Sequence, residues 1–321
     1  MDPDLAFLAM KAPQRAATDV DLYILAGQSN GDGTSGFASA KPGTRDAGRY
    51  ENVRYCARDR ATDGRYRFYF ERFEPVHEGL GSSTELIGPE LGMARVLDPL
   101  YDAPDRKAVI VKVGAGGTSL LMHEPLHPRY TDEKSIKRFR ARGSWYPSAE
   151  EGDYWQPSGF LLRELKDYAS HVYRFLQGME FRSVTFRAIC WMQGETDRHY
   201  PDEYAAVFPV FCRSIREHLT ALTGADQSRL PIVAGEISET FGSIDEASVA
   251  QNRAFIAMQR GLQATIPALT AIPTSGFKLN VPGEHGESIP VGQDAFHWNY
   301  TDMLAIGELF GKAAYEQSHK A

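Results

Sequence analysis

Two short polar segments near opposite ends of the chain carry residue types suited to acyl transfer. The segment GQSN at 27–30 places Ser29 directly after an apolar run, and DAFHWN at 294–299 places Asp294 three residues before His297. A serine hydroxyl becomes a nucleophile when a base removes its proton, and a carboxylate can hold that base in the required tautomer. These residues therefore predict a serine hydrolase with Ser29 as nucleophile, His297 as base and Asp294 as acid.

Acyl transfer also needs hydrogen-bond donors for the oxyanion of the tetrahedral intermediate. The candidates are the backbone N–H of Ser29, the N–H of Gly116 or, one register away, of Gly117, and the side-chain amide of Gln193. The sequence leaves the choice between the two glycines open.

Two further acids stand in the segment WMQGETD at 191–197. Glu195 is a second candidate for the acid of the triad, or a supporting one. Two carboxylates beside one imidazole would favour its protonated form, which cannot act as a base. We therefore favour Asp294 over Glu195, and we expect Asp197 to be a solvated turn residue or a helix cap.

The elements that must position these residues alternate along the chain. Short apolar runs predict strands at 21–26, 108–113, 183–191 and 231–236, and amphipathic stripes predict helices at 89–101, 160–177, 201–222, 248–265 and 299–317. Strands that alternate with helices indicate a parallel sheet covered on both faces. Ligands of such sheets bind beyond the carboxyl ends of the strands, where three of the polar segments follow.

Five segments in this order resemble SGNH-type hydrolases of the GDSL superfamily, and within it carbohydrate esterase family six and the sialate O-acetylesterase-like proteins. They are GQSN (27–30), GPELGMA (88–94), GAGGTSL (114–120), WMQGETD (191–197) and DAFHWN (294–299). The resemblance covers about residues 21–315 and implies an α/β fold, a flavodoxin-like three-layer α/β/α sandwich with a central, mainly parallel sheet. It also implies one esterase domain over residues 1–321, with its core at about 20–315.

The same resemblance implies removal of O-acetyl groups from carbohydrates, of acetylxylan or sialate type, through an acyl-enzyme and without a cofactor. Ser29 matches the family's nucleophile, His297 its base and Gly116 its oxyanion glycine. Gln193 stands where many members of the superfamily have asparagine. The expected partner is an acetylated saccharide.

The region 120–158 is polar, aromatic and irregular, which is typical of a substrate loop inserted in the fold. Its residues Trp145, Tyr154 and Trp155 could stack on sugar rings or anchor the loop to the core. Gln28 and Asn30, on either side of Ser29, complete the predicted substrate contacts.

Two other classes of function remain open from the sequence. The segment HEPLH at 123–127 matches the H-E-x-x-H zinc signature, with His123 and His127 as ligands. That motif works on a helix, and Pro125 inside it would cost about 3 kcal/mol of helix stability, so we expect no metal. A catalytically silent carbohydrate-binding protein would need a broken triad, and none is visible.

Composition excludes several partners. The net charge of −7 argues against a nucleic-acid surface, and no apolar run approaches the roughly 18 residues of a membrane span. The segment MDPDLAFLAMK lacks the positive charge of a signal peptide, which fits a cytoplasmic protein or an exported one whose signal is absent from this sequence. The cysteines Cys56, Cys190 and Cys212 are expected to be buried free thiols. Oligomeric state stays open.

Overall fold

The computed structural model describes residues 7–60, 66–68, 73–122, 143–147, 159–242, 245–280 and 294–320, without the side chains of 58–60 and 66–68. A parallel sheet forms its centre, with the strand order β10-β9-β8-β1-β7-β3. These strands are β1 (Asp19–Gly27), β3 (Arg49–Arg60), β7 (Arg106–Gly114), β8 (Ser183–Met192), β9 (Ile232–Gly235) and β10 (Leu269–Ile272). The short strands β4 (Tyr66–Phe68) and β5 (Glu74–His77) pair antiparallel with β3, and β2 (Ser35–Gly36) pairs with β6 (Leu86–Ile87) in a separate ribbon.

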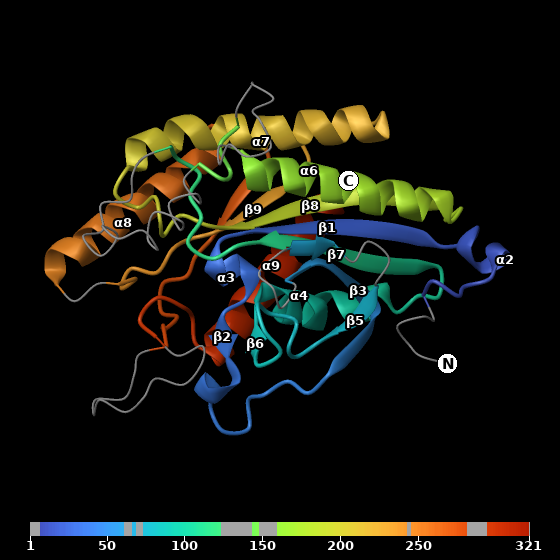
Figure 1. Cartoon of the computed structure of the whole chain (residues 1–321), viewed down its shortest axis with the longest axis horizontal. Coiled ribbons are helices and arrows are strands. Elements are labelled where there is room, and N and C mark those ends of the chain that lie inside the picture. The colour runs from blue at the N-terminus through green and yellow to red at the C-terminus, as the bar shows by residue number, and fades with distance from the viewer. Residues whose placement is uncertain are drawn as a thin grey trace.

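Helices cover both faces of this sheet (Figure 1). One face carries α6 (Phe160–Gly178), α7 (Pro201–Thr223) and α8 (Glu246–Gly261), and the other carries α4 (Pro89–Leu97) and α9 (Tyr300–Ser318). If β3 is set aside, the order β7-β1-β8-β9-β10 is the 2-1-3-4-5 order of flavodoxin-like folds. Strand β3 lies between β1 and α4 in the sequence and extends the sheet beyond β7. The predicted three-layer α/β/α fold class is confirmed.

The burial of β1 shows why its sequence is apolar throughout. Leu22 and Ile24 belong to the core under α6, α7 and α8, whereas Tyr23 and Leu25 belong to the core under α4 and α9. Successive side chains of a strand point to opposite faces, so a strand covered on both faces needs a continuous apolar run.

Helices α4 and α9 approach each other through glycine. A Cβ atom on Gly92 would lie 2.1 Å from the carbonyl oxygen of Leu304, and one on Gly307 would lie 2.3 Å from that of Pro89. Backbone contact at this distance excludes any side chain at either glycine. The segment GPELGMA therefore fixes the position of α9, the helix that directly follows DAFHWN.

The predicted strands and helices are confirmed within a few residues at each end, and the three cysteines are buried free thiols. The long strand β3 and the short strands β2, β4, β5, β6 and β10 were not predicted. Of the region 120–158, the structure describes only 120–122 and 143–147, so His123, His127, Tyr154 and Trp155 lie outside the described residues. Among the helices that are described, none is both long and apolar enough to cross a membrane.

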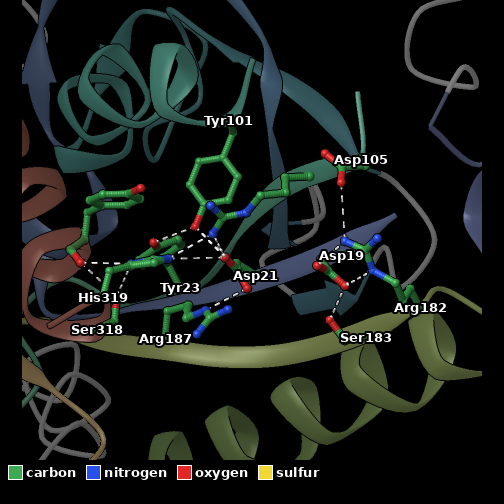
Figure 2. A network of polar contacts seen from close by, with 12 residues as sticks. Asp19, Asp21, Tyr23, Tyr101, Asp105, Arg182, Ser183, Arg187, Ser318 and His319 are labelled. Carbon is green, nitrogen blue, oxygen red and sulfur yellow. Dashed lines mark hydrogen bonds and ion pairs between the residues drawn. The ribbon is translucent and has the colours of Figure 1, made fainter. Parts of the chain in front are cut away.

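A buried charge network holds the amino-terminal end of the sheet (Figure 2). Asp21 is 1% exposed, and its carboxylate accepts hydrogen bonds from Arg187 at 2.7 Å, from Arg106 at 3.0 Å and from the Tyr101 hydroxyl at 2.7 Å. The two arginines start from β7 and β8, the neighbours of β1 on either side. One carboxylate thus ties together the three central strands.

Replacing Asp21 should therefore destabilise the fold. The change Asp21→Asn leaves Arg106 and Arg187 without their counter-charge, and breaking such a buried pair costs about 3–5 kcal/mol. Urea denaturation measures the loss. The matched control is Asp105→Asn, since Asp105 is half exposed and pairs with an exposed Arg182 at 3.5 Å, a contact that solvent screens and that should contribute little to stability. Equal losses in the two variants would contradict the assignment.

Candidate active site

The strands β1, β7 and β8 end at one level, and the polar segments follow them there. Gly27 pairs with Gly114 on one side and with Met192 on the other. A Cβ atom on Gly27 would lie 2.0 Å from the carbonyl oxygen of Met192, which accepts a 3.0 Å hydrogen bond from the Gln28 N–H. The chain can turn sharply here only because residue 27 is glycine.

Ser29 begins the one-turn helix α3 (Ser29–Asp32), directly after this turn. Its side chain is largely buried, with 8% of the residue exposed. Because Ser29 is the first residue of the helix, its backbone N–H has no intrahelical acceptor. This N–H is therefore a donor that a ligand beside the hydroxyl could use.

The side chains of Asp294 and His297 form a hydrogen-bonded pair. Oδ2 of Asp294 lies 2.6 Å from Nδ1 of His297, while Oδ1 accepts from the backbone N–H groups of Phe296 and His297, each at 2.7 Å. Burial opposes ionisation of Asp294, but the hydrogen bond and charge of His297 together with the two N–H groups outweigh it and lower its pKa below the usual value. An ionised Asp294 fixes the imidazole through Nδ1, so the ring would accept a further proton at Nε2.

The Asn30 amide joins the loop of Ser29 to the loop of His297. Its Nδ2 donates to Oε1 of Glu195 at 2.7 Å and, in a longer contact of 3.5 Å, to the carbonyl oxygen of Phe296. Its Oδ1 accepts from the backbone N–H of Trp298 at 3.3 Å. Phe296 and Trp298 flank His297, so this single amide connects the loop of His297 to Ser29, the residue before Asn30.

Gln28 and Asn30 were predicted to contact substrate, and in the structure both side chains are buried and bond neighbouring loops. Asn30 is 1% exposed and its amide is engaged as just described. Gln28 is 3% exposed, and its Oε1 accepts from the backbone N–H groups of Gly194 at 3.4 Å and Thr196 at 3.3 Å. Both side chains hold the loops together instead.

Of the two candidate acids, Asp294 is the one bonded to the ring of His297. Glu195 is buried, and within the described part of the chain its Oε2 has no hydrogen-bond partner, while Oε1 accepts from Asn30. Burial raises the pKa of Glu195, although the Asn30 bond and the charge of His297 oppose that rise. Glu195 therefore supports Asn30, which in turn holds the residues around the base.

Of the two candidate glycines, Gly116 lies beside Ser29. A Cβ atom on Gly116 would lie 3.5 Å from Cβ of Ser29, whereas one on Gly117 would meet nothing within 4 Å. Gly117 also has a φ of +70°, in the left-handed region that favours glycine. Gly116 is thus the better placed of the two to donate to a ligand at Ser29.

The Gln193 amide, predicted as an oxyanion donor, is engaged within the protein. Gln193 is 1% exposed, and its Nε2 donates to Oδ2 of Asp197 at 2.6 Å and to the carbonyl oxygen of Thr118 at 3.3 Å. Its Oε1 accepts from the Tyr204 hydroxyl at 3.1 Å. Both N–H groups of the amide are engaged within the protein, so neither is available to a ligand.

Comparison with known proteins identifies the family of this chain. Residues 19–315 match the family described as carbohydrate esterase, sialic acid-specific acetylesterase. This chain belongs to that family. It is therefore a carboxylic ester hydrolase that removes O-acetyl groups from carbohydrates.

Two solved structures share the fold of the esterase. A protein from Arabidopsis thaliana has a TM-score of 0.57 and 17% identity, over 92% of this chain and 98% of the other. NanS has a TM-score of 0.61 and 16% identity, over 92% of this chain and 97% of the other. A search of curated proteins gave no match.

Of the two alternatives left open for Trp145, the structure favours the anchor to the core, and Trp145 is no exposed platform for sugars in the esterase. It is 0% exposed, its ring centroid lies 5.0 Å from that of Trp191, and its Nε1 donates to Oγ1 of Thr118 at 2.9 Å. An exposed aromatic residue among those described is Phe296, which is 45% exposed, packs against Phe241 and directly precedes His297. Sequence reasoning missed it, although an aromatic residue adjacent to the expected base was a usable signal.

Asp197 was expected to be solvated, but it is 3% exposed. Its carboxylate accepts from the Ser119 hydroxyl, from the backbone N–H of Leu120 at 2.8 Å and from Gln193 at 2.6 Å. Burial raises its pKa to about 6, because these hydrogen bonds offset only part of the cost of burying the charge.

Among the described residues, no group of three or more His, Cys, Asp or Glu side chains could hold a metal.

The raised pKa of Asp197 predicts a pH dependence of stability. Between about pH 4 and pH 6 the unfolded carboxyl ionises while the folded one keeps its proton, so the free energy of unfolding should fall as the pH rises through this window. The full effect is about 3 kcal/mol. Urea denaturation at several pH values should show the wild type losing stability relative to Asp197→Asn, which cannot titrate. A difference that stays constant from pH 4 to pH 6.5 would contradict the burial effect.

Proposed function

We propose that the esterase works through a serine acyl-enzyme, with Ser29 as nucleophile, His297 as base and Asp294 as the acid that orients it. The observation that carries the proposal is the 2.6 Å bond between Asp294 and Nδ1 of His297, in a loop that the amide of Asn30, the neighbour of Ser29, bonds through the Trp298 N–H. An ionised carboxylate at Nδ1 keeps the neutral imidazole in the tautomer whose Nε2 can take a proton.

In the first half of the reaction, Oγ of Ser29 attacks the acetyl carbonyl carbon and its proton moves to Nε2 of His297. The carbonyl oxygen becomes an oxyanion, which accepts from the backbone N–H groups of Ser29 and Gly116. The C–O bond to the sugar then breaks, and His297 returns the proton to the departing sugar oxygen. The products of this half are the free hydroxyl of the sugar and acetyl-Ser29.

In the second half, His297 takes a proton from water, and the resulting hydroxide attacks the acetyl carbonyl of acetyl-Ser29. Collapse of the second tetrahedral intermediate returns the proton to Oγ of Ser29 and releases acetate. Both oxyanions use the same two backbone donors, since Gln193 is engaged elsewhere. Tyr154 and Trp155 stay predicted contacts of the saccharide.

Replacement of Ser29 should abolish turnover. The change Ser29→Ala removes the only group that forms the acyl-enzyme in this mechanism, so kcat/KM for p-nitrophenyl acetate and for an acetylated saccharide should fall by about 10⁴–10⁶. Acetate release measures this, and mass spectrometry after a fluorophosphonate probe should find the label on Ser29. Ser83→Ala, at an exposed serine, is the control and should keep full activity. Near-normal turnover of Ser29→Ala would refute the nucleophile.

The two acids should differ clearly in their effect on kcat. Asp294→Asn loses the acid that fixes the tautomer of His297, which costs about 10⁴ in kcat in serine proteases. Glu195→Gln keeps an acceptor for Asn30 and should cost less than about a hundredfold, because Glu195 does not contact the ring. Steady-state kinetics of both variants on one acetyl ester test this. A larger loss for Glu195→Gln would reverse the two roles.

A further inference from the structure

The loop that carries Gly116 is held at both of its ends. We call residues 115–121 the oxyanion loop. At its start, the Ala115 N–H donates to the carbonyl oxygen of Gly27 at 3.2 Å, which ties the loop to the end of β1. Gly116 and Gly117 are exposed, and residues 118–121 are buried again. The position of the Gly116 N–H therefore depends on what holds the buried half of the loop.

That buried half is bonded on one side by residues 143–145, where the Trp145 N–H donates to the Ser119 carbonyl oxygen at 3.2 Å and Nε1 of Trp145 to Oγ1 of Thr118 at 2.9 Å, and on the other side by the segment after β8. Oδ2 of Asp197 accepts the backbone N–H of Leu120 at 2.8 Å, and Oδ1 accepts the Ser119 hydroxyl. Gln193 adds a third connection, since its Nε2 bonds both Oδ2 of Asp197 and the carbonyl oxygen of Thr118. One carboxylate and the amide bonded to it thus contact three consecutive residues of the oxyanion loop.

Burial of the Asp197 carboxylate lowers the stability of the fold. Within the described residues Asp197 has no ion-pair partner, unlike Asp21, which has two arginines. Burying an acid without a cation costs stability unless hydrogen bonds compensate, and the pKa of about 6 indicates that they compensate only in part. The hydrogen bonds of the buried carboxylate go to Ser119 and Leu120 of the oxyanion loop and to Gln193, which itself bonds that loop.

We propose that Asp197 is a positioning residue for catalysis: through Ser119 and Leu120 it sets the oxyanion loop so that the Gly116 N–H meets the oxyanion formed at Ser29. The inference rests on the proposed acyl-enzyme mechanism. Asp197 does not touch the reacting atoms in this scheme, so its effect must pass through the loop. A donor displaced from the oxyanion weakens the transition state more than it weakens substrate binding.

The hydrogen-bond pattern around Ser119 shows which substitution should preserve the loop. The Ser119 hydroxyl has one hydrogen, yet it lies within bonding distance of the Leu121 carbonyl oxygen at 2.8 Å and of Oδ1 of Asp197, and it also accepts the Leu121 N–H at 3.0 Å. In Asp197→Asn, Nδ2 can donate to Ser119, which then donates to Leu121, while Oδ1 accepts from Leu120. Every connection is kept, whereas Asp197→Ala removes them all.

The test compares Asp197→Ala with Asp197→Asn on p-nitrophenyl acetate. For Asp197→Ala we expect kcat to fall by about 10²–10³, as for one lost oxyanion donor, with KM within about threefold of the wild type. The affinity of an acetyl-sized trifluoromethyl ketone, which forms a tetrahedral adduct with an oxyanion, should fall by a similar factor. Asp197→Asn should keep kcat within about fivefold.

The control for mere loss of a buried acid is Asp21→Asn. Asp21 lies six residues before Gly27 on β1, or about 20 Å from the end of the strand at roughly 3.3 Å per residue. This variant should lose stability and keep the kcat of its folded fraction, which a fluorophosphonate titration of Ser29 counts. If Asp197→Ala behaves in the same way, the positioning role is overturned.

A milder variant covers the case in which Asp197→Ala does not fold. Ser119→Ala removes one of the connections and should lower kcat by about tenfold at constant KM. An unchanged kcat in Ser119→Ala, or equal losses of kcat in Asp197→Ala and Asp197→Asn, would overturn the proposal. Because Ser29→Ala is measured beside them, failure of this inference is distinguishable: Ser29→Ala would still be inactive if only the role of Asp197 is wrong.

Discussion

The geometry of the site depends on the side-chain amide of Asn30. It is one residue from Ser29, it reaches the backbone on both sides of His297, and it bonds Glu195 after β8. Three segments that are far apart in the sequence are thereby fixed by one group. An amide suits this task because it donates and accepts at once and carries no charge to be neutralised in a buried position.

Close backbone approach provides the frame around this amide. Gly27 lets the chain turn against β8 before Ser29, and Gly92 and Gly307 let α4 and α9 pack at backbone distance. Because α9 directly follows the loop of His297, its packing against α4 limits where the base can lie. The flavodoxin-like order of strands then places the loops after β1, β7 and β8 side by side at one edge of the sheet.

The buried acids have different roles at the two ends of the parallel strands. Asp21 is neutralised by arginines and ties strands together, so its charge adds to the stability of the fold. Asp197 and Glu195 lack such partners among the described residues and hold loops through hydrogen bonds, with raised pKa values as a consequence. The acid that stabilises the sheet and the acids that hold the loops of the site thus lie at opposite ends of the strands, as is common where a rigid sheet presents functional loops.

By itself, the sequence determined the fold class and the pairing of Asp294 with His297, because strand and helix periodicity is local and Asp294 reaches His297 within one short segment. Only the tertiary structure decided the roles of side chains whose partners are distant. Gln193, Asn30 and Trp145 have residue types that fit ligand contacts, yet all three are buried against segments far away in the chain. Burial and hydrogen-bond partners depend on how loops meet in space, which residue type and spacing do not encode.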